Sequence, residues 1–157
     1  MLAKIQTLSE YKTTKLTMYL IDTNVISEQR KQHKANAGVR RFFQTAIEQD
    51  ERLYISVVTV GELRRGVELI RYRGDQSQAN LLESWLETVL DSYADSILNF
   101  TLVEAQVWGK LRVPQPQNAI DKQIVATALT HELALVTRNM KDFTDIGLRL
   151  LNPFEDL

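Results

Sequence analysis

The sequence predicts a single three-layer α/β/α domain, in which helices cover both faces of a central parallel sheet of about five strands. Short apolar runs alternate along the chain with segments whose apolar residues recur at helical spacing. Strands separated by helices pair in parallel, because each helix returns the chain to the edge where the previous strand began. A length of 157 residues suits one such domain and is enough to bury a core.

Five segments are predicted to be strands. The first is MYLI at residues 18–21, a short apolar run that ends in the polar turn Asp-Thr-Asn. The others are residues 53–57, 97–100, 134–136 and a short segment near 149–151. Residues 1–17 form a polar extension ahead of the first strand, so the domain is predicted to span 18–157. A translation start at Met18 and a genuine N-terminal arm are both compatible with this extension.

Helices are predicted where apolar residues recur every three or four positions. They cover residues 36–50, 60–70, 79–93, 103–111 and 119–131. Thr59 precedes the second of these helices and Glu62 follows three residues later, as in a capping box. The segments RGDQSQA and VPQPQN, at residues 73–79 and 113–118, are expected to be a turn and a loop.

The composition excludes several classes of protein. The chain has no cysteine, which excludes disulfides, thiolate nucleophiles and zinc–thiolate sites. No apolar run approaches the roughly 20 residues of a membrane helix, and the first residues lack the apolar core of a signal peptide. A cytoplasmic protein with no membrane contact is therefore expected. The net charge of −1 conceals two basic clusters, at residues 30–41 and 64–73.

Polar residues follow the first and fourth predicted strands. Asp22 comes directly after the first strand, and Asn139 and Asp142 come shortly after the fourth. Ligands of open parallel sheets collect beyond the carboxyl ends of the strands, so these side chains are expected on one rim.

Two further acids, Asp121 and Glu62, each have a structural and a functional interpretation. Apolar residues follow Asp121 at i+3, i+4 and i+7, which aligns its carboxylate with the apolar stripe of its helix. An acid in a first turn suits the helix dipole, but an acid aligned with a core face needs a partner or a metal. The capping box, or an ion pair with Arg64 or Arg65, would explain Glu62 if it stood alone.

As a set, the acids favour a hard metal ion. Several carboxylates in one cleft repel each other unless cations neutralise them. Oxygen ligands select Mg²⁺ or Mn²⁺ over zinc or copper. Such an ion activates water and stabilises charge on a phosphoryl group, so no nucleophilic side chain is required.

Four short motifs follow one another along the chain. They are DTNVISE at residues 22–28, VGELRRGV at 60–67, DKQIVATA at 121–128 and VTRNMKDF at 136–143. The chain then ends in Asn152-Pro153-Phe154 and three further residues. This series resembles the motifs of the PIN-domain superfamily, especially those of its VapC- and FitB-like toxins. The DTN triplet alone is a weak signal, but the ordered motifs cover nearly the whole chain.

The resemblance implies a role for each motif residue. The catalytic, metal-binding core would consist of three acids: Asp22, Glu62 and Asp121. Some relatives have Asp in place of Asn139, whereas others rely on the acid before the Phe. Asp142 is therefore predicted to be the fourth catalytic and metal-binding acid, with Asn139 assisting. The candidates for positioning water or phosphate are Thr23, Asn24 and Thr137, although Thr137 is equally explained as a strand-end hydroxyl bonded to the backbone.

By the same resemblance, the chain would be a Mg²⁺- or Mn²⁺-dependent endoribonuclease that hydrolyses RNA phosphodiesters, for example in tRNA or rRNA. It would form a homodimer and be the toxin of a VapBC-type toxin–antitoxin pair. The C-terminal segment of a VapB-like antitoxin would block its cleft, and an antitoxin arginine could pair with the acids. DNA would be bound only through the antitoxin.

Four basic residues are candidates to hold the RNA backbone through phosphate contacts: Arg30, Lys31, Lys34 and Arg65. A solvated helix start explains the first three equally well, and a surface ion pair is the more common fate of a residue such as Arg65.

Three alternatives stay open. A haloacid-dehalogenase-type phosphatase also has an Asp after its first strand, but it needs a second Asp where this chain has Asn24. A DNA-directed nuclease would share the broad fold. A catalytically degenerate PIN domain would act as a protein-binding module, for which Asn139 is the only support.

Overall fold

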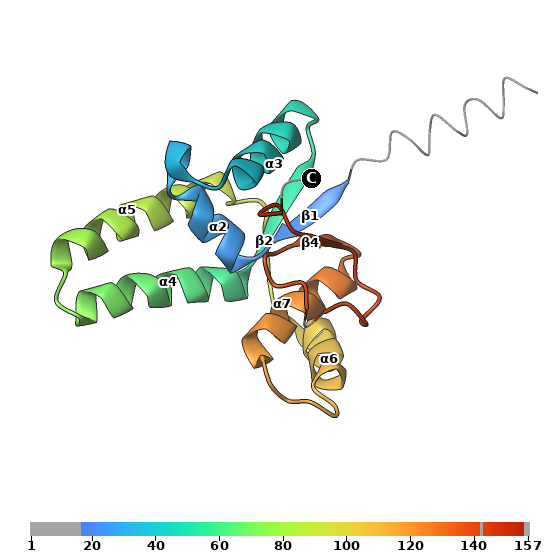
Figure 1. The fold of residues 1–157 in the computed structure, drawn as a ribbon. Helices are drawn as coiled ribbons and strands as arrows, with labels where there is room; N and C mark the ends of the chain where they lie inside the picture. Colours follow the sequence, from blue (N-terminus) through green and yellow to red (C-terminus); the bar gives the residue numbers. More distant parts are fainter. Residues whose placement is uncertain (1–16, 142, 156–157) are drawn as a thin grey trace, which may run out of the picture.

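The computed structural model describes residues 17–141 and 143–155, and a five-stranded parallel sheet lies at its centre (Figure 1). The strands are β1 (Met18–Ile21), β2 (Arg52–Ser56), β3 (Ile97–Leu98), β4 (Ala134–Val136) and β5 (Leu150–Leu151). Their order across the sheet is β3-β2-β1-β4-β5, and every pair is parallel. The predicted parallel sheet is confirmed.

The pairing of β1 with β4 determines which residues meet at the carboxyl edge of the sheet. Ile21 is in register with Val136, so the residues that follow them, Asp22 and Thr137, leave the sheet side by side. The backbone N–H of Asp22 donates a 2.9 Å hydrogen bond to the carbonyl oxygen of Val136, and that of Thr137 donates a 2.9 Å bond to Leu151. Backbone hydrogen bonds at the carboxyl edge of the sheet therefore hold both residues in place.

Helices cover the two faces of the sheet, as a three-layer domain requires. One layer consists of α2 (Thr23–Gln29), α3 (Ala37–Glu48), α4 (Val57–Tyr72) and α5 (Gln76–Ser92). The other consists of α6 (Leu102–Leu111) and α7 (Ala119–Thr130). Successive strand side chains point to opposite faces, so Ile21 packs into the core beneath the first layer and Leu20 into the core beneath α7.

The Asp-Thr-Asn segment after β1 differs from its prediction as a turn, because it begins the helix α2. Asp22 is the N-cap of that helix, and its Oδ1 accepts a 2.8 Å hydrogen bond from the backbone N–H of Thr23. A short polar cap offers no apolar periodicity, so the spacing of apolar residues does not reveal this helix.

The start of α4 also differs from its prediction. The helix begins at Val57, where the hydroxyl of Ser56 caps it by accepting a 3.0 Å hydrogen bond from the N–H of Val58. The predicted capping box of Thr59 and Glu62 is therefore wrong, since both residues lie inside the helix. The β-branched residues around position 57 favour a strand locally, but the serine cap starts the helix before Thr59.

The remaining boundaries differ from the predictions by a few residues. The strand β3 ends at Leu98 instead of residue 100, and α5 begins at Gln76 instead of 79. A capping box does occur at the start of α6, where Thr101 and Glu104 bond each other's backbone N–H groups. Residues 1–16 of the predicted extension lie outside the described residues. Within the described ranges, the helices are all too short or too polar to cross a bilayer.

The end of the chain packs against the first turn of α3. A side chain at Gly38 would overlap the carbonyl oxygen of Pro153, so the absence of a Cβ allows this close approach. Phe154 packs on the core beneath α2 to α5, and its N–H donates a 3.0 Å hydrogen bond to Oδ1 of Asn152. The Asn-Pro-Phe ending thus closes the domain over α3.

Candidate active site

Asp22 is a buried carboxylate at the carboxyl end of the central strand. Asp22 is 5% exposed, and three hydrogen-bond donors contact its two carboxylate oxygens. Oδ1 accepts the N–H of Thr23, while Oδ2 accepts the hydroxyl of Thr137 at 2.7 Å and the amide of Asn24 at 3.2 Å. Ion pairs among the described residues involve other acids and none involves Asp22.

Burial and hydrogen bonding act on the charge of Asp22 in opposite directions. Burial raises the pKa of Asp22, because a low-dielectric surrounding disfavours the carboxylate. The bonds from Thr137, Thr23 and Asn24 lower this pKa, but burial outweighs them. Within the described residues, this buried carboxyl therefore has hydrogen-bond donors but no ion pair.

Thr137 and Asn24 connect Asp22 to the loop after β4. Thr137 is fully buried, and its hydroxyl oxygen also accepts the backbone N–H of Asn139 at 3.0 Å. Asn24 donates to Asp22 through its amide and accepts the backbone N–H of Arg138 at 3.1 Å. Thr137 and Asn24 therefore each bond both the carboxylate and the neighbouring backbone. Five of the predicted site residues take part in these hydrogen bonds: Asp22, Thr23, Asn24, Thr137 and Asn139.

Glu62 lies on α4, beside the outer end of this network. It is half-buried and lines a cavity of about 340 Å³ together with Thr23, Ser27 and Arg30. The hydroxyl of Thr23 also donates a 3.2 Å hydrogen bond to Thr59 on α4, which holds α2 against the helix that carries Glu62. Arg64, one of the two arginines considered as a partner of Glu62, pairs instead with Glu83 at 2.7 Å.

Asp121 lies in the first turn of α7, where a carboxylate interacts favourably with the positive end of the helix dipole. The residue is half-buried. Its helix packs against α4, so the two helices that carry Glu62 and Asp121 are in contact.

The donor set fits a hard, incompletely coordinated ion. Within residues 17–141 and 143–155, no three acid or histidine side chains form a ready-made cluster for one metal. Asp142 lies outside the described residues, so the predicted four-acid set remains a prediction. Mg²⁺ is commonly held by one or two carboxylates, with waters and substrate phosphates completing its shell. The buried carboxylate of Asp22 fits that mode of binding.

The predicted RNA-backbone candidates lie in different surroundings. Arg30 lines the cavity beside Glu62, whereas Lys31 forms a 2.7 Å ion pair with Glu28. Lys34 is exposed in a 3-10 turn (Gln32–Lys34), and Arg65 is exposed on α4. Arg30 is thus the candidate that the structure brings beside a predicted acid.

Two residues near the site were absent from the sequence prediction. Thr59 is fully buried and supports Thr23, although it had been assigned to a cap. Lys122, directly after Asp121, is 8% exposed and bonds the carbonyl oxygen of Gln115. A cation in the first turn of a helix opposes the helix dipole, and this unused signal could have pointed to Lys122.

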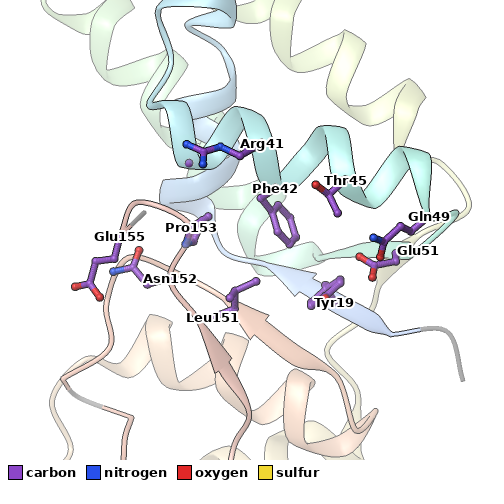
Figure 2. Close-up of a pocket in the computed structure, with 11 residues that line it drawn as sticks. Tyr19, Arg41, Phe42, Thr45, Gln49, Glu51, Leu151, Asn152, Pro153 and Glu155 are labelled. Carbon is purple, nitrogen blue, oxygen red and sulfur yellow. The ribbon is translucent and has the colours of Figure 1, made fainter. Parts of the chain in front are cut away.

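Another cavity, of about 390 Å³, lies between α3 and the end of the chain (Figure 2). Its lining includes Tyr19, Phe42 and Leu151, and Figure 2 shows their side chains grouped below α3. None of the predicted site residues that the structure describes lines it. The volume of a cavity therefore does not locate the acids of this protein.

A buried carboxylate thus follows the central parallel strand, and further acids lie on two helices that contact each other. Residues 19–147 match the PIN domain family, and the chain belongs to this family.

Several known proteins are similar to the chain over most of its length. Toxin FitB from Neisseria gonorrhoeae is 33% identical over 145 residues, which are 88% of this chain and 100% of FitB. A VapC ribonuclease from Sinorhizobium fredii is 31% identical over 144 residues, covering 88% of this chain and 99% of that protein. The structure of FitAB bound to a DNA fragment superposes with a TM-score of 0.76 at 30% identity, covering 89% of this chain and 98% of that chain.

Proposed function

We propose that this PIN-domain protein is a Mg²⁺- or Mn²⁺-dependent endoribonuclease and the toxin of a VapBC-type toxin–antitoxin pair. The observation that carries the proposal is Asp22, a buried carboxylate at the carboxyl end of the central strand with three hydrogen-bond donors and no ion pair within the described part of the chain. The similarity to a VapC ribonuclease supports RNA as the substrate.

Some residues of the site would bind the metal ion, and others would orient the side chains that bind it. Asp22, Glu62, Asp121 and Asp142 would be the metal-binding acids. A bound divalent ion supplies an activated water and stabilises charge on the phosphoryl group. Thr137 and Asn24 hold the carboxylate of Asp22 in one orientation, and Asn139 is placed beside them through its backbone. No side chain of the protein has to form a covalent bond to the RNA.

The 340 Å³ cavity beside Glu62 supports an antitoxin as the partner. Its floor is apolar, with Leu63, Val67, Leu82 and Trp85 from α4 and α5. Its rim carries Thr23, Arg30 and Glu62, next to the site. An apolar groove with a polar rim suits the apolar face of a peptide helix. An antitoxin segment in this cavity would cover Glu62, and an arginine from it would pair with that acid.

The rest of the proposal follows from the same relatives. The similar FitAB structure is a toxin–antitoxin complex bound to a DNA fragment, which supports a cognate antitoxin as the partner. We propose that this chain meets DNA only through that antitoxin. We place the protein in the cytoplasm, where RNA and a cognate antitoxin are found, and we propose that it acts as a homodimer.

The decisive experiment compares RNA cleavage by the wild-type protein, Asp22→Asn and Asp95→Asn. Purified, antitoxin-free proteins are incubated with mixed tRNA and rRNA in Mg²⁺, Mn²⁺ or EDTA. Asp95 is exposed in the turn before β3, so its variant makes the same chemical change away from the site. We expect discrete fragments from wild type and Asp95→Asn with either metal, and none in EDTA or from Asp22→Asn.

Other outcomes lead to other conclusions. Equal cleavage by all three proteins would identify a contaminating nuclease. Cleavage of matched DNA in preference to RNA would favour the DNA-directed nuclease. Absence of cleavage, with tight binding of a cognate antitoxin, would favour the degenerate binding module.

A further inference from the structure

A second polar pocket lies beside the candidate active site, on the side of α7. It has a volume of about 240 Å³. Its walls come from the loop before α7, the first turn of α7 and the loop after β4. The charged residues among its lining are Lys122, Lys141 and Asp145, and amide and hydroxyl side chains make up most of the rest.

We propose that this pocket binds a backbone phosphate of the RNA strand next to the one that is cleaved. The proposal rests on the proposed ribonuclease function and names a substrate contact for it. Among the described residues that line the pocket, two lysines stand beside one acid. Amide and hydroxyl groups beside lysines are the groups that proteins use to contact phosphate oxygens without reading the base sequence.

The position of Lys122 is the main argument for an anionic ligand. The residue is 8% exposed and lies in the first turn of α7, where the helix dipole disfavours a cation. Burial of an ammonium is also unfavourable unless acceptors surround it. In the described part of the chain, its Nζ contacts one acceptor, the carbonyl oxygen of Gln115 at 2.5 Å. An ammonium has three N–H donors, so it can bond that carbonyl and a phosphate oxygen together.

The pocket and the site draw residues from the same two segments, the first turn of α7 and the loop after β4. Lys122 directly follows Asp121, and Lys141 is two residues after Asn139, whose backbone bonds Thr137. The loop that carries Lys141 therefore begins at the residue that orients Asp22. An RNA strand with one phosphate at the acids would bring a neighbouring phosphate toward this pocket.

The experiment measures binding of a short single-stranded RNA in EDTA, where cleavage is not expected, by fluorescence anisotropy at several salt concentrations. The variants are Lys122→Met, Lys122→Arg and Lys141→Met. The matched control is Arg52→Met, at the start of β2 and away from the carboxyl edge of the sheet. Circular dichroism checks each fold. Lys141 is exposed, so its variant tests the pocket even if Lys122→Met does not fold.

If the pocket binds phosphate, each Lys→Met variant weakens RNA binding by about 5- to 10-fold. The slope of log K against log salt also becomes less steep by about 0.7 for each lysine, the value for one single-strand phosphate contact. Lys122→Arg and Arg52→Met keep the wild-type affinity and slope.

Two results would overturn the proposal. One is wild-type affinity and slope in both Lys→Met variants. The other is an acidic peptide that binds as tightly as RNA and loses the same affinity in the variants, which would assign the pocket to a protein partner.

The same preparations are assayed for RNA cleavage in Mn²⁺, which separates this proposal from the proposed function. Cleavage by wild type, with binding that the lysine variants leave unchanged, rejects the pocket and keeps the ribonuclease. Lysine-dependent RNA binding without any cleavage keeps the pocket and rejects the ribonuclease.

Discussion

The hydroxyl of Thr137 donates a 2.7 Å hydrogen bond to Oδ2 of Asp22, across the ends of two adjacent strands and 115 residues of sequence. Both side chains are buried, at 0% and 5% exposure. Because a hydrogen bond to a carboxylate favours its ionised form, Thr137 opposes the effect of burial on the pKa of Asp22. Thr137 is thus one of the three donors that favour the ionised form of the proposed metal ligand.

Replacement of Thr137 by valine keeps the shape of the side chain and removes this donor. The pKa of Asp22 should rise further, so less of it is ionised at a given pH. We expect the acid limb of the pH profile for RNA cleavage to move to higher pH, with about tenfold lower activity near neutrality. The control is Thr130→Val, because within the described residues the buried hydroxyl of Thr130 has no hydrogen-bond partner. A wild-type profile for Thr137→Val would contradict the assigned role.

The raised pKa of Asp22 also predicts the effect of Asp22→Asn on stability. A raised pKa means that the folded state favours the protonated acid, so stability from this group is present at low pH and lost as the pH rises through that pKa. In EDTA near neutral pH, Asp22→Asn should therefore unfold at a higher temperature than wild type. The difference should disappear below about pH 4, where Asp22 is protonated in both states.

Addition of Mn²⁺ should make wild type unfold at a higher temperature than Asp22→Asn. A metal at one hundred times its dissociation constant stabilises the folded state by about 2.7 kcal/mol. Wild type should gain this stabilisation and Asp22→Asn should not, as measured by thermal unfolding with and without Mn²⁺. Asp95→Asn should behave like wild type throughout. An Asp22→Asn variant that is less stable in EDTA would mean that its hydrogen bonds outweigh the cost of burying the charge.

Gly66 provides a test of the antitoxin groove, because it lies on α4 and lines the 340 Å³ cavity. A Cβ at this position would meet nothing within 4 Å. Gly66→Ala should therefore stabilise the helix by about 0.5–1 kcal/mol. Gly66→Leu should extend into the cavity and weaken inhibition by the cognate antitoxin, while cleavage by the free protein is retained. Gly109→Leu on α6, which also has open space, is the control. Equal inhibition of both leucine variants would place the antitoxin elsewhere.

Replacement of Gly38 by alanine should have the opposite effect on stability from Gly66→Ala. An added Cβ would overlap the carbonyl oxygen of Pro153, a backbone atom that can move only with the end of the chain. Gly38→Ala should lower the free energy of unfolding by about 1–3 kcal/mol. Gly61→Ala on α4 has open space and should be neutral or stabilising. Denaturant midpoints measure both, and an unchanged midpoint for Gly38→Ala would show that the Asn-Pro-Phe segment moves without cost.

Glu104 gives a prediction about acid stability. Burial by itself raises the pKa of Glu104, but hydrogen bonds from Thr101, from the backbone and from His131 outweigh it and lower the pKa to about 2. A lowered pKa stabilises the fold above the unfolded value of about 4.3, and this stability is lost as the pH falls toward 2.

Glu104→Gln should therefore destabilise the protein by about 1–3 kcal/mol at neutral pH, and by progressively less between pH 4.5 and 2. Urea unfolding across this pH range measures the difference. Glu87→Gln, at an exposed position on α5, is the control. A constant difference at all pH values would assign the loss to packing instead of charge.

The strands and helices were predictable where apolar residues recur at a regular spacing within one segment. The strands at 18–21 and 134–136 agree with their predictions residue for residue, and the parallel-sheet rule placed Asp22 near the loop after β4. The helix α2 was missed because a polar cap and two turns give little periodicity. The burial of Lys122 was also missed, because it depends on a loop that folds back over α7. Contacts between segments that are distant in the sequence leave no periodic pattern of apolar residues.

The central place of β1 has a consequence for the order of synthesis. Asp22 directly follows β1, but Thr137, which follows β4 and donates to the Asp22 carboxylate, is synthesised 115 residues later. At about 5–20 residues per second, a growing chain spends roughly 6–23 seconds without the partner of its central carboxylate. The hydrogen bonds around Asp22 therefore stay incomplete on the ribosome until β4 and Thr137 have been made.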